Sequence, residues 1–178
     1  MSDQIFTVPS AETAALRPGS RILIVGKSPE VRERFASQIL AKTEEPHVVV
    51  EVRTLEDLEA FDQDSGDILV VHDMVALIRA HRELERPLLA LLESGVTAIL
   101  TTDDRLDRIA PSIANACDLR YWAWRAGDDE PGVMGFVKVF TPMDAMAADL
   151  LENGRSGDDR PFALRNAGGG DLELIEID

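Results

Sequence analysis

Several kinds of residue are scarce in this chain of 178 residues. It contains one cysteine, Cys117, and only 5% of its residues are aromatic. A single cysteine forms no internal disulfide, which favours a reducing compartment. No apolar run approaches the roughly 20 residues of a membrane-spanning helix, and residues 1–18 lack the basic segment and apolar core of a secretory signal. The sequence therefore predicts a cytoplasmic protein with no membrane insertion.

Positive charge is scarce as well. Asp and Glu number 33 against 18 Lys and Arg, which gives a formal net charge of −15, and the lysines are Lys27, Lys42 and Lys138. Such a surface repels the phosphates of nucleic acids and anionic membranes, so we expect no nucleic-acid partner. An acidic composition also keeps a protein soluble in concentrated salt. Together with the low lysine content, it favours a salt-loving archaeon as the source, with a GC-rich actinobacterium as the alternative.

What the sequence does contain is an alternation of apolar strands and amphipathic helices. A hydrophobic content of 45% over 178 residues suits one domain with a real core. Short apolar runs predict strands at 21–25, 47–52, 67–72 and 96–101. Helical spacing of apolar residues begins after Pro29 and recurs at 55–61 and 82–94. This alternation predicts a mainly parallel sheet with right-handed crossovers.

The pattern changes after residue 102. A short polar helix is expected at 103–110. Strands at 118–125 and 133–140 are predicted to form a hairpin, a helix to follow at 142–151, and the glycines 168–170 to turn a small terminal hairpin. We therefore divide the chain into an N-terminal lead-in (1–18), an α/β core (19–142) and a C-terminal extension (143–178).

The order of these parts resembles the RecA/KaiC-type ATPase domain. LRPGSRILIVGKSPEVRERFASQIL (16–40) resembles its opening turn, strand, phosphate loop and helix. GDILVVHDMVAL (66–77) resembles the strand that carries its metal-associated acidic residue, with Asp73 at that position. Four further segments resemble the later strands and the closing segment of that family: SGVTAILTTD, ACDLRYWAW, GVMGFVKVF and RPFALRNAGGGDLELIEI. The resemblance implies a three-layer, mostly parallel RecA-like α/β sheet with an antiparallel C-terminal edge, and side-by-side assembly with copies or relatives.

Gly26-Lys27-Ser28 has the letters that end a phosphate loop but not the spacing. The motif G-x-x-x-x-G-K-[ST] wraps phosphates in backbone N–H groups between a strand and a helix. With Gly26 as its first glycine, the second glycine falls on Val31, the lysine on Arg32 and the hydroxyl residue on Glu33. Valine is poorly suited to positive φ, and a carboxylate ~4 Å from a phosphate costs about 4 kcal/mol at an effective dielectric of about 20. We therefore expect a degenerate loop, where the helix N-terminus retains at most weak anion binding.

A second alignment takes Gly26-Lys27-Ser28 as the end of the motif. The preceding residues are then strand, so no cradle for phosphates remains. In either alignment Asp73 is a metal-associated carboxylate or the N-cap of a helix that begins at Met74. A water-activating carboxylate would follow the strand at 47–52, where Glu51 and Glu56 occur. We interpret both as solvated charges.

Other chemically capable residues form no recognisable set. The three histidines, His47, His72 and His81, lack the further ligands of a metal site, so no metal is expected. Cys117 lies in an apolar run and is interpreted as buried. Trp122 and Trp124 share one face of their strand, either in the core or as anchors of a protein interface.

We therefore interpret the chain as a RecA/KaiC-like domain that has lost its phosphate loop. It would act without a cofactor and without catalysis, as a regulatory or scaffolding protein that binds a protein partner or its own copies. One alternative is a divergent KaiC-like ATPase in archaeal signalling or motility, which would bind ATP and Mg²⁺ through Gly26, Lys27, Ser28, Arg32 and Asp73. The other is a flavodoxin-like receiver module, which the order of the strands decides.

Overall fold

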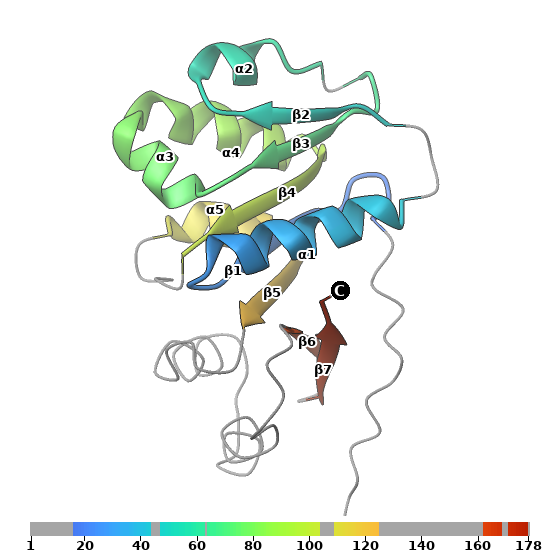
Figure 1. Ribbon diagram of the computed structural model, residues 1–178. Coiled ribbons are helices and arrows are strands. Elements are labelled where there is room, and N and C mark those ends of the chain that lie inside the picture. Colours follow the sequence, from blue (N-terminus) through green and yellow to red (C-terminus); the bar gives the residue numbers. More distant parts are fainter. Residues whose placement is uncertain are drawn as a thin grey trace, which may run out of the picture.

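A seven-stranded sheet forms the centre of the molecule (Figure 1). The computed structural model describes residues 16–43, 47–62, 64–103, 109–124, 162–168 and 171–177. The strands are β1 (Arg21–Val25), β2 (Val49–Val52), β3 (Ile68–Val71), β4 (Thr97–Thr102), β5 (Leu119–Trp124), β6 (Phe162–Gly168) and β7 (Asp171–Glu176). Their order across the sheet is β2-β3-β4-β1-β5-β6-β7.

The first five strands run parallel, which confirms the predicted mostly parallel α/β fold. β1 lies in the middle, with Ile24 opposite Thr101 of β4 on one side and Tyr121 of β5 on the other. β6 pairs with β5, and β7 with β6, in antiparallel register. The order of the parallel strands differs from the 2-1-3-4-5 order of flavodoxin-like receivers, so the receiver hypothesis is wrong.

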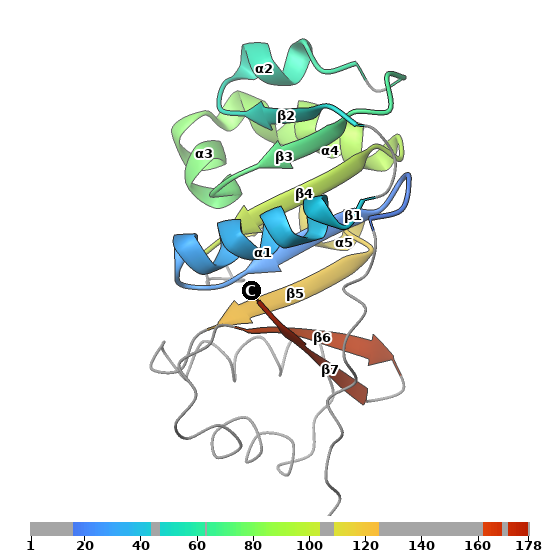
Figure 2. The same ribbon diagram turned by 45° about the vertical axis from the view of Figure 1, so that its right-hand side comes forward.

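Helices cover both faces of the sheet (Figures 1 and 2). One face carries α1 (Pro29–Ala41), and the other carries α2 (Leu55–Glu59), α3 (Met74–Ala80), the 3₁₀ turn η1 (Arg82–Leu84), α4 (Glu85–Glu93) and α5 (Pro111–Ala116). The apolar run of β1 explains this arrangement. Its alternating side chains enter two separate cores: Leu23 and Val25 pack under α2 to α5, while Ile22 and Ile24 pack under α1.

The helices differ from the sequence prediction in two places. The helix expected at 82–94 begins as the 3₁₀ turn η1 at Arg82–Leu84 and continues as α4 to Glu93, and His81 (φ −134°, ψ 78°) separates it from α3. Pro87 is tolerated because it lies in the first turn of α4, where its missing N–H has no helical partner. α5 was not predicted at all. Within the described residues, no helix is both long and apolar enough to cross a bilayer.

Several expected elements lie outside the described residues. These are the strand at 133–140, the helix at 142–151, most of the helix at 103–110, most of the lead-in and the boundary at 142/143. The neighbours of β5 in the sheet are β1 and β6, so the expected hairpin between 118–125 and 133–140 is wrong.

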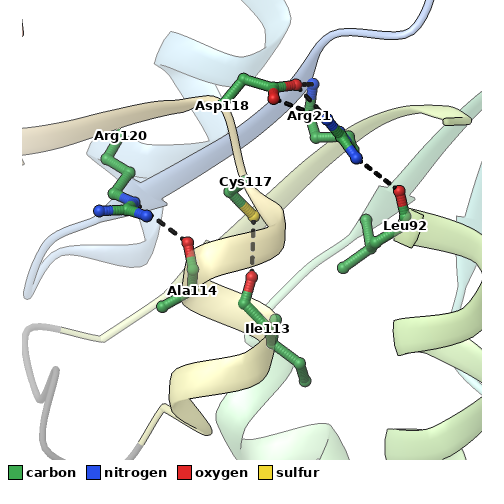
Figure 3. Close-up of polar contacts among 7 residues, drawn as sticks. All are labelled: Arg21, Leu92, Ile113, Ala114, Cys117, Asp118 and Arg120. Carbon is green, nitrogen blue, oxygen red and sulfur yellow. Dashed lines mark hydrogen bonds and ion pairs between the residues drawn. The ribbon is translucent and has the colours of Figure 1, made fainter.

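The amino end of the sheet is held by an arginine–carboxylate pair (Figure 3). Arg21 begins β1 and donates from Nε and Nη2 to the two carboxylate oxygens of Asp118, at 2.9 and 2.6 Å, and from Nη1 to the carbonyl of Leu92, at 2.8 Å. The side-chain hydrogen bond to Arg21 lowers the pKa of Asp118. One side chain thus joins β1, α4 and the start of β5.

Candidate nucleotide site at the carboxyl ends of the strands

In an open parallel sheet, ligands bind beyond the carboxyl ends of the strands. At that edge β4 holds its neighbours through two contacts. The N–H of Gly26, after β1, donates to the carbonyl of Thr102 at 3.2 Å, and the N–H of Asp73, after β3, donates to Oγ1 of Thr101 at 3.1 Å. Gly26 and Asp73, which the sequence placed in one candidate site, therefore lie at the same edge of the sheet.

The loop between β1 and α1 has three residues. β1 ends at Val25 and α1 begins at Pro29, so only residues 26–28 connect them. A phosphate loop needs eight motif positions, most of them before the helix. Val31, at the position of the second glycine, is fully buried in the core under α1, and Glu33 is exposed. The short loop leaves too little backbone to wrap a triphosphate.

Some of the N–H groups at and after this loop are committed within the chain. That of Gly26 is bonded to β4, Pro29 has none, and that of Val31 donates to Oγ of Ser28 at 3.4 Å. Ser28 acts as the N-cap of α1, as the sequence indicated. Its hydroxyl, which a phosphate-loop serine would give to Mg²⁺, serves the helix instead.

Gly26 is a glycine for a steric reason that the sequence did not reveal. A Cβ atom built there would lie 2.2 Å from the carbonyl oxygen of Ala123 in β5. Any larger residue would have to push β1 away from β5. Gly26 therefore allows close packing of two strands, and its φ is not in the positive range.

Arg32 fills the space between the loop and β3. Its side chain is only 2% exposed, although it is charged. Nη1 donates to the carbonyl of Gly26, and Nη2 forms an ion pair with Oδ1 of Asp73. The residue that an ungapped count aligns with the phosphate-loop lysine thus binds the chain's own loop and the carboxylate at the metal-associated position.

Asp73 has an unusual backbone. It occupies the N-cap position of α3 in the left-handed region (φ 47°, ψ 46°), yet its side chain makes no capping hydrogen bond. A non-glycine residue there costs about 1 kcal/mol or more, least for Asp and Asn. Asp73 therefore occupies the N-cap position, as the N-cap interpretation expected, but its side chain does not cap the helix. The carboxylate binds Arg32 instead.

Other polar atoms at this edge have no partner among the described residues. They are Nε of Arg32, Oγ1 of Thr102 and Oδ1 of Asp103, each buried. Buried polar atoms of this kind usually bind ordered water or a ligand. The edge therefore contains buried polar atoms in addition to the Arg32–Asp73 pair.

The remaining candidate residues are dispersed. Glu51 pairs with Arg53 at 2.8 Å and lies 3.9 Å from Nε2 of His72, and Glu56 is an exposed residue of α2. Within the described residues, no group of three His, Cys, Asp or Glu side chains could hold a metal ion.

Lys27 is exposed on the three-residue loop. Trp122 is 1% exposed and packs in the core under α2 to α5, so it presents no surface for a partner; the side chain of Trp124 lies outside what the structure describes. Cys117 is buried, its thiol contacts the carbonyl of Ile113 at 3.4 Å (Figure 3), and burial raises its pKa to about 12.

The sheet with helices on both faces has the fold of an ATPase-like α/β domain. Among solved structures, the DNA-packaging ATPase B204 from Sulfolobus turreted icosahedral virus matches with a TM-score of 0.52 and 11% identity, over 89% of this chain and 97% of that one. The genome packaging NTPase B204 from Sulfolobus turreted icosahedral virus 2, in complex with AMPPCP, matches with a TM-score of 0.50 and 10% identity, over 88% and 97%. No protein-family profile and no curated protein sequence matches the chain.

Proposed function

We propose that this chain is a RecA/KaiC-like domain without catalytic activity, which acts in regulation or scaffolding through protein–protein contacts in the cytoplasm of a salt-loving archaeon. The composition supports the source, because acidic residues outnumber basic ones by 33 to 18 and lysines are few. The ATPase-like fold is compatible with the RecA/KaiC-like assignment, which itself rests on the order of the sequence segments. At 10–11% identity this likeness concerns the fold alone.

The Arg32–Asp73 ion pair is the observation that carries the proposal. An active phosphate loop leaves its lysine free for phosphates and the acidic residue after the strand free for Mg²⁺. Here the corresponding positions neutralise each other, and the arginine also bonds the loop carbonyl. A nucleotide would have to break this pair and expose a buried guanidinium. ATP and Mg²⁺ therefore do not fit the residues present.

The test is calorimetric titration of the full chain with Mg-ATP in concentrated salt, with phosphate release measured in parallel. We expect no saturable heat with millimolar nucleotide and no release above buffer. The matched variants are Lys27→Ala and Arg32→Ala. If the loop binds no phosphate, Lys27→Ala behaves like the parent. Micromolar binding that Lys27→Ala abolishes would overturn the proposal.

A second candidate is a divergent ATP-binding, KaiC-like ATPase of archaeal signalling or motility. Two observations favour it: the fold is that of solved NTPases, and buried polar atoms of Thr102 and Asp103 have no partner in the described residues. It predicts saturable nucleotide binding that Arg32→Ala weakens, because Arg32 is one of its binding residues, and a Mg²⁺ dependence that Asp73→Asn removes. Titration of both variants separates the two candidates.

A further inference from the structure

The edge strand β2 carries an unusual exposed surface. β2 is the outermost strand on one side of the sheet (Figure 2). Among the described residues, the large hydrophobic side chains that are exposed are Val48, at 61%, and Val49, at 38%, both at the start of this strand. Proteins usually protect such edges with Lys, Pro or a bulge, because an open edge pairs with other strands. β2, Val-Val-Glu-Val, has no Lys, Pro or bulge, and its protection is limited to its short length and the charge of Glu51.

The hydrogen-bond pattern identifies which backbone groups face outward. The N–H of Ile68 donates to the carbonyl of Val48 at 2.9 Å, and Ile68 lies opposite Val49. In a parallel pair this places the backbone of Val48 and Val50 toward β3. The N–H and C=O groups of Val49 and Glu51 therefore point away from the sheet and can accept a further strand.

The side chains of β2 differ between the two faces. Val50 and Val52 pack with the core under α2. Val49 is not part of the core under α1 and remains 38% exposed. The surface that a new strand would extend is thus apolar at Val49 and flanked on the same face by His47 and Glu51.

We propose that β2 pairs in antiparallel fashion with β2 of a second copy of this chain, about a two-fold axis at Val49. This inference rests on the proposed function, for which it names the contact surface and the partner. The pairing joins two sheets into one continuous sheet. It places Val49 opposite Val49 of the second copy and covers the exposed valines on both sides.

The side chains that face each other distinguish this register from its neighbours. With the axis at Val49, Glu51 lies opposite His47 of the second copy, so the carboxylate faces an imidazole and not a second carboxylate. An axis at Val50 would set His47 opposite Arg53 and Val49 opposite Glu51. An axis at Glu51 would set two carboxylates against each other, which is destabilising. Of these three registers, only the one centred on Val49 sets no carboxylate opposite a valine or a second carboxylate.

The net charge of −15 opposes association of two copies at low salt. Salt shortens the Debye length from about 10 Å at 0.1 M to about 3 Å at 1 M, which screens this repulsion between whole molecules. We therefore expect association to tighten as salt rises. Sedimentation velocity over a wide range of concentrations, at low and at molar NaCl, measures it.

Two cysteine variants test the register. In a hydrogen-bonded antiparallel pair the opposed Cα atoms are about 5.5 Å apart, within the range of about 4.4–6.8 Å that a disulfide spans. Val49→Cys should therefore crosslink under mild oxidation. Val48 lies diagonally from its own copy at roughly 7–8 Å, so Val48→Cys should crosslink several-fold less, although Val48 is the more exposed residue. Cys117 is buried and does not compete.

A proline variant tests the edge itself. Val49→Pro removes an N–H that points away from β3, so the ladder inside the sheet is kept. It should weaken dimerisation at least tenfold relative to Val49→Ala, which keeps the N–H. A circular-dichroism melt of both variants verifies that they fold. If Val49→Pro does not fold, the comparison of Val49→Cys with Val48→Cys tests the pairing of the two strands.

Three results would overturn the inference: a monomer at every concentration and salt, equal crosslinking of the two cysteine variants, or a dimer that persists in Val49→Pro. None of these results bears on the proposed lack of nucleotide binding. Conversely, nucleotide binding would overturn the proposed function while the crosslinks stood.

Discussion

Replacing Asp73 by asparagine should destabilise the protein through one defined loss. Asparagine keeps the oxygen that accepts from Arg32 and tolerates the left-handed backbone at φ 47°. The substitution therefore removes the negative charge and little else. The guanidinium of Arg32, 2% exposed, would then remain buried without a counter-charge.

The expected magnitude follows from the burial of the two partners. Removing one partner of a fully buried pair costs about 3–5 kcal/mol, whereas exposed pairs contribute about 0–1 kcal/mol. The side chain of Asp73 is 48% exposed and that of Arg32 is 2% exposed, so the pair lies between these limits. We expect Asp73→Asn to cost about 1–2 kcal/mol, which lowers Tm by roughly 2–8 °C at this chain length.

The assay is urea unfolding of four proteins: the parent, Asp73→Asn, Arg32→Met and the double variant. Methionine fills the space of the arginine stem without charge, and such replacements are often neutral. Once Arg32 is gone, Asp73→Asn should cost almost nothing, so the coupling free energy should be about 1–2 kcal/mol. Additive losses, or a loss below about 0.3 kcal/mol for Asp73→Asn, would refute the reasoning.

Three further predictions concern other parts of the molecule. Gly26→Ala should lower the free energy of unfolding by about 2–3 kcal/mol, because the new Cβ meets the Ala123 carbonyl. Gly66→Ala, where no atom lies within 4 Å, should cost only about 1 kcal/mol, because of its φ of +79°. The midpoints of urea unfolding compare the two variants. Asp118→Asn should cost about 0.5–1 kcal/mol at pH 7. Because the folded pKa of Asp118 lies below 3.8, that difference should be present above pH 3.8 and vanish as pH falls through the folded value, and an unchanged difference at lower pH would contradict it. Raising NaCl from 0.1 M to molar concentration should raise Tm, since it screens the net charge of −15; a constant or falling Tm in a thermal melt would count against this.

Local sequence patterns predicted the parts of the fold that depend on local physics. The apolar run of β1 predicted a strand covered on both faces, and its alternate side chains do enter two cores. Ser28 and Pro29 predicted the start of α1, because a capping hydroxyl and a fixed φ act within one turn. The helix α5 (Pro111–Ala116) was missed, because six residues with one buried side chain, Ile113, are too few for a helical spacing to be recognised.

For the candidate site as well, some features could be predicted from the sequence and others required the folded structure. Counting residues was enough to show that the loop after β1 lacks the spacing to wrap phosphates and that Arg32 takes the place of the lysine. Counting could not show where Arg32 points, since its partners lie six residues away at Gly26 and 41 residues away at Asp73. Nor could it show that Gly26 is required by Ala123, almost 100 residues later in the chain. Periodicity and spacing are properties of neighbouring residues and can be read from the sequence; ion pairs and backbone clashes arise between strands that only the folded sheet brings together.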